Sequence, residues 1–277
     1  MIFFTLFPWI CAIFGLIVGS FLNVIILRTE QSETLGGRSH CNKCQKTLRW
    51  YELIPIVSFL IQRGRCRSCN TQISIQYLLV EVLTAILFTI AGQYALMLFW
   101  SPFSIVFFIG LGLLFIIFSL IIILSIYDVR TKRVPVRWLM YLVVTSILYL
   151  VVYYIDSDIF LLGSFIPHML GILVGVPFLV IYLLSSGRLI GFADIEIITW
   201  MGMMLGVAAG WDAVILAFYL GAIFAIGFVG YHIIIKKESY KTIRKKTIAF
   251  VPFLFLGWLV TTLTQFSIIE LFTSLFL

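Results

Sequence analysis

Long apolar stretches dominate the chain, and short polar stretches separate them. The apolar segments cover roughly residues 2–27, 75–99, 104–127, 138–155, 159–184, 195–210, 213–235 and 248–275. Most of them approach or exceed the roughly 20 residues that a helix needs to cross a bilayer. A helix also satisfies its own backbone hydrogen bonds where water is absent. The pattern therefore predicts an all-α polytopic membrane protein with about eight transmembrane helices.

The composition supports a membrane protein and excludes a soluble multi-domain one. Apolar residues make up 62% of the chain and charged residues 11%, whereas soluble proteins average about 25% charged residues. The first apolar segment ends in Arg28 and lacks the basic start and small-residue cleavage site of a signal peptide. We therefore interpret it as a retained span.

The positive charges predict the topology. All 19 Lys and Arg residues fall in the insert 28–74 and in the loops 128–137, 185–194 and 236–247, which alternate along the chain. By the positive-inside rule these four regions are cytoplasmic and both termini lie outside. The opposite connections contain Asp156, Asp158 and Asp212 instead. The net charge of +7 thus reports orientation next to membrane lipid and gives no reason to expect nucleic acid as a partner.

The insert contains two CxxC motifs, Cys41 with Cys44 and Cys66 with Cys69. This spacing is close to that of zinc ribbons, and a closed shell of four thiolates implies a structural Zn²⁺. Disulfides are the alternative, but they are rare in the reducing cytoplasm. The sequence therefore predicts a small cytoplasmic zinc-ribbon-like insert.

Other residues in and near the insert leave questions open. The apolar stretch LIPIVSFL, residues 53–60, suits either the core of the ribbon or a segment resting on the membrane surface. We expect His40 to be a bystander, because four Cys ligands are already available. Cys11, inside the first segment, is expected to be a packing residue.

Acidic residues at the edges of the apolar segments are candidates for catalysis, because charges there are costly and tend to mark function. Asp128 follows the apolar run FSLIIILSIY, and Asp194 opens the sixth segment from the same side. Two such carboxyl groups that share a proton can act as an aspartic-protease pair. In the alternative, Asp128 begins a charged loop and Asp194 caps a helix. For Glu81, inside the second segment, pairing with a basic residue of the insert is favoured over chemistry.

Taken together, these motifs resemble the type IV prepilin leader peptidase family. The resemblance rests on GSFLNVIILR at the end of the first segment, the double CxxC insert, QISIQYLLVEVLTA, the acid motifs YDVRTKRVP and GFAD, and the late IAFVPFLFLG. Their order and spacing cover nearly the whole chain. The resemblance implies a GxGD-type aspartyl protease with Asp128 and Asp194 as its dyad and without metal at the reaction centre.

The resemblance also implies partners, cofactors and a division of the chain. Expected substrates are prepilins or pilin-like secretion and competence proteins, whose basic leader is cut after Gly at the cytoplasmic face of the bacterial inner membrane. Family members often also N-methylate the new terminus with S-adenosylmethionine, and the sequence does not locate a pocket for it. The expected parts are a first transmembrane helix (1–27), the cytoplasmic insert (28–74) and a seven-helix peptidase core (75–277).

The sequence departs from the family pattern at two positions. Ala193 stands where G-x-G-D has its second Gly, and Glu196 stands where a Lys commonly follows the second Asp. Because Glu196 places an anion near the dyad, a shifted pH optimum is expected.

The chief alternative function is a non-enzymatic zinc-ribbon membrane assembly factor whose basic loops bind anionic lipid. A transporter is a distant third, because the sequence lacks a visible pair of interrupted midplane helices.

Overall fold

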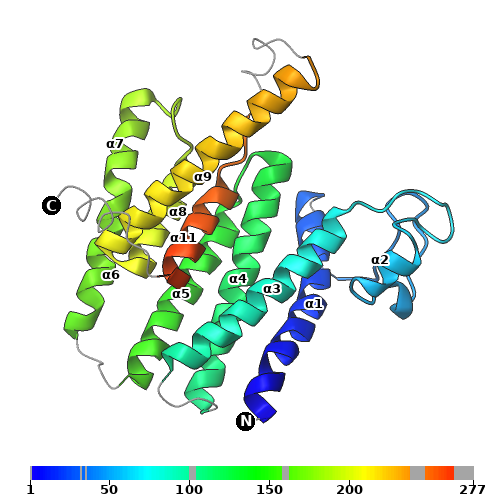
Figure 1. The fold of residues 1–277 in the computed structure, drawn as a ribbon, viewed down its shortest axis with the longest axis horizontal. Coiled ribbons are helices and arrows are strands. Elements are labelled where there is room, and N and C mark those ends of the chain that lie inside the picture. Colours follow the sequence, from blue (N-terminus) through cyan, green and yellow to red (C-terminus); the bar gives the residue numbers. More distant parts are fainter. Residues whose placement is uncertain are drawn as a thin grey trace. The chain divides into compact units, whose positions relative to one another are not determined.

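A computed structural model describes residues 2–31, 33–34, 36–99, 104–157, 162–237 and 247–264. These residues form α-helices and short 3₁₀ helices, with no strand beyond two isolated bridges. The α-helices are α1 (Ile2–Glu30), α2 (Val57–Ile61), α3 (Gln76–Leu98), α4 (Ile105–Thr131), α5 (Val136–Asp156), α6 (Ile166–Gly171), α7 (Val176–Ser185), α8 (Phe192–Leu205), α9 (Val207–Ile234) and α11 (Val251–Thr264) (Figure 1). The predicted all-α fold class is confirmed.

Six stretches of the described chain are long and apolar enough to cross a membrane. They are Thr5–Glu30, Gln76–Leu98, Ile105–Thr131, Val136–Asp156, Ile166–Ser185 and Val207–Ile234. The two remaining apolar segments of the sequence correspond to α8 and α11, which have 14 residues each. The last predicted segment extends to residue 275, and its part beyond Thr264 lies outside the described residues. The multi-pass membrane architecture is confirmed.

The boundary between the sixth and seventh segments differs from the prediction. Gly206 has a φ of +81° and separates α8 from α9, so α9 begins several residues earlier than expected. This φ lies in the region that favours glycine, and the continuous apolar sequence around it concealed the break. Asp212, which the sequence analysis placed in a loop, consequently lies inside α9 and is buried.

The chain forms two compact units, Met1–Ile123 and Leu124–Leu277. In the first unit, α1 packs along α3 (Figure 1). Small residues permit the close approach, because a Cβ at Gly19 would lie 2.8 Å from the Cα of Glu81. Phe88 of α3 stacks on Phe115 of α4 with ring centroids 4.1 Å apart. These contacts hold α3 near its start, at Glu81, and at its middle, at Phe88.

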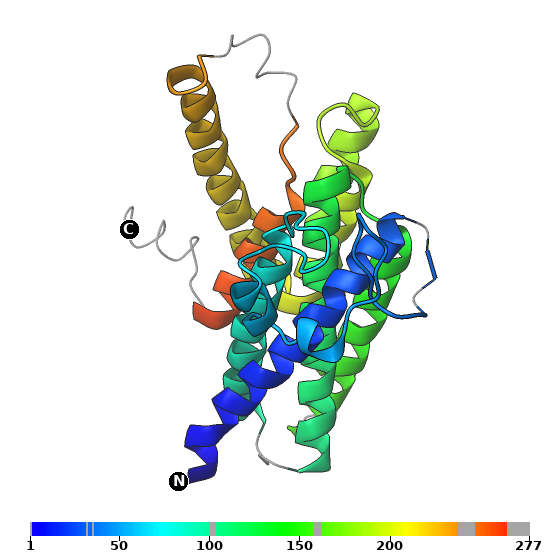
Figure 2. The same ribbon diagram turned by 90° about the vertical axis from the view of Figure 1, so that its right-hand side faces the viewer.

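In the second unit, α8 is the central helix, and most of its side chains are buried. Trp200 of α8 donates a hydrogen bond to the Ser146 hydroxyl of α5 at 2.8 Å, and its ring lies 5.0 Å from that of Trp258 of α11. The helix α11 also packs against α9, and Figure 2 shows the two from a second direction. The helix that begins beside Asp194 is thus held by α5, α9 and α11.

We expect Gly202→Ala to lower the stability of the second unit. A Cβ at this position would overlap the backbone carbonyl of Gly171, where α6 crosses α8. Overpacking a close contact costs about 1–3 kcal/mol, which would lower the unfolding temperature of the detergent-purified protein. Gly227→Ala is the matched control, because a Cβ there meets nothing within 4 Å. Equal unfolding temperatures for the two variants would contradict the close crossing.

Candidate active site and metal centre

Asp128 lies in the last turn of α4 and is only 7% exposed. Its Oδ2 accepts a hydrogen bond of 3.2 Å from the backbone N–H of Val251, the first residue of α11. The late motif IAFVPFLFLG therefore contributes the helix start that binds this carboxylate. The first N–H groups of a helix lack partners within the helix and are suited to an acidic side chain. Asp128 is accordingly part of the packed helix bundle and does not simply begin a charged loop.

Asp194 is the third residue of α8, and Gly191 is the N-cap. Its carboxylate accepts a hydrogen bond from the Gly191 backbone N–H, as acidic residues at this position often do. A Cβ at Gly191 would lie 3.1 Å from Asp194 Oδ2, so glycine leaves room around the carboxylate. Asp194 is therefore not the N-cap residue, as the alternative required. It accepts a hydrogen bond from the backbone of the N-cap residue, Gly191.

The fold brings Asp128 and Asp194 together although 66 positions separate them in the chain. The two groups are close enough for the negative charge of Asp128 to act on Asp194.

Ala193, between Gly191 and Asp194, is a helical residue without a positive φ. Its methyl group is therefore compatible with the local backbone. Glu196 is partly exposed on the same helix.

The two CxxC motifs form turns of the same construction. Cys41 N–H donates to the Lys46 carbonyl, and Cys66 N–H donates to the Thr71 carbonyl. Each turn closes at a residue with a positive φ, Gln45 at 56° and Asn70 at 58°. The matching bonds present the sulfur atoms of both motifs to one point.

The four sulfur atoms of Cys41, Cys44, Cys66 and Cys69 all lie within 4.8 Å of one another. Cys41 Sγ and Cys69 Sγ are 3.8 Å apart, which is about the edge of a tetrahedron whose corners lie 2.3 Å from a zinc ion. Backbone hydrogen bonds from Cys69 and Ser68 lower the pKa of Cys66 to about 6, whereas at Cys69 the backbone bond of Thr71 is outweighed by burial and the neighbouring thiols, which raise the pKa of Cys69 to about 11. One thiolate is thus favoured by the protein itself, and a bound metal ion would favour the others. The cluster therefore fits a four-coordinate metal ion.

Burial and hydrogen bonding show the surroundings of the apolar stretch 53–60, of Glu81 and of Cys11. The stretch 53–60 does not form a ribbon core, because Leu53, Val57 and Leu60 are exposed. Glu81 binds the insert, but through the backbone N–H of Ile56 at 2.7 Å instead of through a basic side chain. Cys11 is buried against Gly92, as expected of a packing residue.

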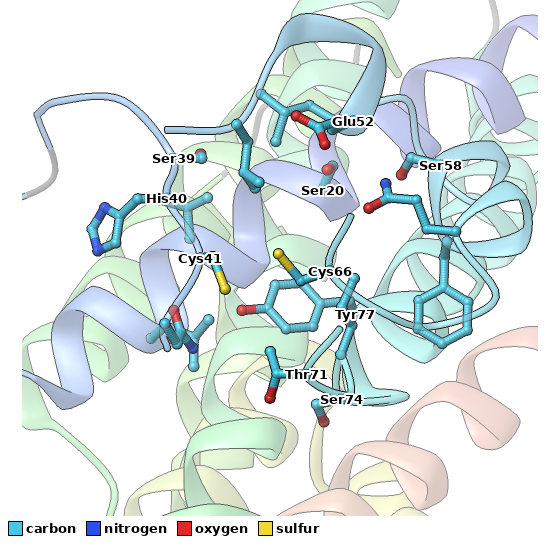
Figure 3. Close-up of a pocket in the computed structure, with 18 of the residues that line it drawn as sticks. Ser20, Ser39, His40, Cys41, Glu52, Ser58, Cys66, Thr71, Ser74 and Tyr77 are labelled. Carbon is cyan, nitrogen blue, oxygen red and sulfur yellow. The ribbon is translucent and has the colours of Figure 1, made fainter. Parts of the chain in front are cut away.

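A cavity of about 470 Å³ lies between the insert and the adjoining ends of α1 and α3. Figure 3 shows Glu52 and Ser20 in the upper part of the view and Cys66 and Tyr77 below them. Polar groups in its wall include Ser20, Ser39, Ser58, Tyr77, Glu33, Glu52 and Glu81 and the basic side chains of Arg28 and His40, and apolar ones include Phe21, Leu48, Leu53 and Phe59. Sequence reasoning missed this cavity. The motifs GSFLN and QYLLVE indicated its walls but not the space between them.

Comparisons with known proteins agree over both units. Two family models match, a bacterial peptidase A24 N-terminal domain at residues 13–94 and the type IV leader peptidase family at residues 115–226. A prepilin leader peptidase/N-methyltransferase of Neisseria gonorrhoeae is 32% identical, over 72% of this chain and 74% of that protein. One of the same name from Bacillus subtilis is 32% identical, over 76% and 79%. No solved structure matches significantly. Similarity along about three quarters of these two enzymes shows that the chain belongs to the type IV prepilin leader peptidase family.

Proposed function

We propose that the protein is an aspartic endopeptidase that removes the leader peptide of prepilins or pilin-like proteins, with Asp128 and Asp194 as its catalytic pair. The observation that carries this proposal is the proximity of the two carboxyl groups, which lets the charge of one act on the other. Both residues lie within the region that matches the peptidase model. A helix-capping role alone would not require Asp128 and Asp194 to lie together.

The proposed mechanism follows from two carboxyl groups that share one proton. Like charges at close range disfavour double ionisation, so one group is a carboxylate while the other keeps its proton. The carboxylate takes a proton from water, which attacks the scissile carbonyl carbon, and the carboxylic acid protonates the departing amine. The Val251 and Gly191 N–H groups hold the two acids in place.

The chain is a multi-pass protein of the bacterial inner membrane, and we place its catalytic pair at the cytoplasmic face. The basic insert 28–74 and the loop that contains Arg188 support this orientation. The scissile bond of a prepilin lies where a basic leader meets an apolar helix. Two acids at the cytoplasmic edge of the membrane would meet that bond directly.

This topology predicts that the insert faces the cytoplasm. A reporter domain that becomes active only outside the membrane should stay inactive when it is fused between Gly36 and Gly37, an exposed site. The same reporter fused before Ile2 should be active, because the proposed topology puts the N-terminus outside. Activity at the insert position would contradict the orientation and move the acids to the opposite face.

We further propose that the metal at the cysteine cluster is a structural Zn²⁺. Four thiolates complete a tetrahedral shell and leave no open position for substrate or water. The surrounding segment has few buried apolar side chains in the described residues. Metal binding would therefore supply much of its folding free energy.

A second activity, N-methylation of the new terminus with S-adenosylmethionine, is supported by the cavity under the insert. Its volume lies within the roughly 300–1,000 Å³ of small-molecule sites. Its carboxylates suit a ligand with positive charges, its hydroxyl groups suit a ribose, and Phe21, Phe59 and Leu48 offer apolar surface for a purine. Bound there, the cofactor would supply an electrophilic methyl group. The names of the relatives include the same activity.

One experiment tests both activities. The chain is co-produced with a leader-bearing prepilin in cells that lack other leader peptidases, and the mass of the mature N-terminal peptide is measured. Cleavage after the Gly of the leader supports the peptidase, and the additional mass of one CH₂ group on the mature N-terminal peptide supports methyl transfer. Uncleaved prepilin in the membrane would contradict the proposal.

A further inference from the structure

Glu81 is a buried acid on the wall of the cavity. It is only 7% exposed, and it is one of the residues that line the cavity. The Ile56 N–H donates to its Oε2 at 2.7 Å, and the Ser20 hydroxyl donates a second hydrogen bond. An ionised carboxylate accepts about four hydrogen bonds. With two donors already in place, the carboxylate keeps capacity for a further donor.

Glu81 has no positively charged partner within the described part of the chain. Its two hydrogen-bond donors are a backbone amide and a hydroxyl group. Arg28, which also lines the cavity, directs its guanidinium at the carbonyl groups of Thr34, Gly36, Gly37 and Arg38. A buried charge without a counter-charge is strongly destabilising, and such residues near a membrane tend to be functional. The cavity is thus suited to an occupant that is positively charged.

The backbone beside Glu81 is held in a rare conformation. Ile56 has φ 60° and ψ −54°, and the Val57 N–H donates to the Pro55 carbonyl at 2.6 Å, which makes a strained γ-turn at a β-branched residue. Strain of this kind persists only when the surroundings hold it, and it is concentrated at functional sites. The bond from Ile56 to Glu81 holds the turn against α3.

We propose that Glu81 binds the α-ammonium group of the newly cleaved substrate in this cavity and accepts the proton that this group loses before it is methylated. The inference rests on the methyl transfer under "Proposed function". The ammonium gives one proton to the Glu81 carboxylate. The amine lone pair then forms the N–C bond while the C–S bond of the sulfonium donor breaks, which leaves a neutral thioether and a methylated ammonium. Glu81 later releases its proton to water.

The hydrogen-bonding pattern favours the ammonium over the sulfonium as the partner of Glu81. A sulfonium has no N–H or O–H to donate, whereas the Glu81 carboxylate is already arranged to accept from such donors. The ammonium must also lose a proton before its nitrogen can attack, and the sulfonium has no such requirement. Glu33 and Glu52 also line the cavity and are more exposed than Glu81. Their carboxylates could face the positively charged sulfonium of the methyl donor.

The test is Glu81→Gln in the full-length purified protein with a full-length prepilin and methyl-labelled S-adenosylmethionine. The amide oxygen of Gln can still accept from Ile56 N–H, so the insert stays attached, but the side chain cannot take a proton. We expect leader cleavage and binding of the methyl donor within about twofold of wild type. Methylation at pH 7 should fall at least about 100-fold, the lower range for loss of a general base.

The pH profile separates a proton acceptor from a structural residue. The ordinary pKa of an α-amino group is about 8, so the substrate loses its proton unaided at higher pH. Methylation by the Gln variant should therefore recover as the pH rises from 7 to 9.5, while wild type changes much less. Glu196→Gln is the comparator, because Glu196 is a partly exposed acid of α8 that is not among the residues lining this cavity. Its methylation should fall less than about threefold at pH 7, below the effect of a general base.

The outcomes are distinct. Wild-type methylation rates for Glu81→Gln at pH 7 would overturn the inference. A loss of methylation that does not recover at high pH, or a loss of donor binding, would also overturn it and make Glu81 a structural or donor-binding group. If the wild-type protein cleaves but gives no methylated product, the proposed methyl transfer itself fails and the inference falls with it.

Discussion

Asp128→Asn should reduce leader cleavage by at least about a thousand-fold, within the range for removal of an acid–base group. Asn has the size of Asp, and its amide oxygen can still accept the Val251 N–H bond that α11 provides. It cannot share a proton with Asp194. The measurement is the rate of cleavage of a purified prepilin by the variant in detergent, with the unfolding temperature measured on the same sample.

The control distinguishes a catalytic from a structural loss. Glu196→Gln removes an acid two residues after Asp194 on the same helix, outside the proposed pair. It should keep the cleavage rate, measured for each protein at its own pH optimum, within about threefold, which is far below the loss of an acid–base group. Cleavage by Asp128→Asn at a rate like that of Glu196→Gln would show that Asp128 acts only as a partner of α11.

Cys66→Ser should abolish stoichiometric metal binding and unfold the insert. Structural zinc contributes apparent free energies of about 10–16 kcal/mol in small zinc peptides, and the insert has little apolar core to replace it. Because Cys41 and Cys66 also line the cavity, methyl transfer should be lost together with the metal. The measurements are elemental analysis of the purified protein under reducing conditions, proteolysis of the insert and transfer of a labelled methyl group.

Cys11→Ser is the matched control for the metal, because Cys11 is a buried cysteine of α1 outside the cluster. This variant should keep one metal ion per chain, whatever its effect on packing. Wild-type protein without stoichiometric metal, prepared under reducing conditions, would refute the metal assignment. Metal retained by Cys66→Ser at the wild-type level would exclude Cys66 as a ligand.

Features that have a local pattern in the sequence could be predicted from it. Apolar segments of helical length gave the membrane helices, because burial in lipid requires both apolar side chains and internal backbone hydrogen bonds. The CxxC spacing gave the cluster, because each short turn fixes two sulfur atoms. The acids Asp128 and Asp194 were found by their cost at a membrane edge; the charge of Asp128 acts on Asp194 in the fold, and their catalytic pairing stays a prediction.

Features that depend on three-dimensional packing were not predictable. The break at Gly206 lies within continuous apolar sequence, so hydropathy placed Asp212 in a loop when it is buried in α9. The partner of Glu81 is a backbone amide of Ile56, and side-chain patterns do not identify such a donor. The cavity depends on how the insert folds over α1 and α3. Volume enclosed by segments far apart in the chain has no local sequence signal.

The rate of leader cleavage by Asp128→Asn, Asp194→Asn and the double variant, measured against wild type in one preparation, tests the central claim most directly. If the two carboxyl groups act as a unit, each single change costs about as much as both together. We therefore expect all three variants to be at least about a thousand-fold slower than wild type, with the double variant little slower than either single one. A near wild-type rate for either single variant, in folded protein, would contradict the aspartic dyad.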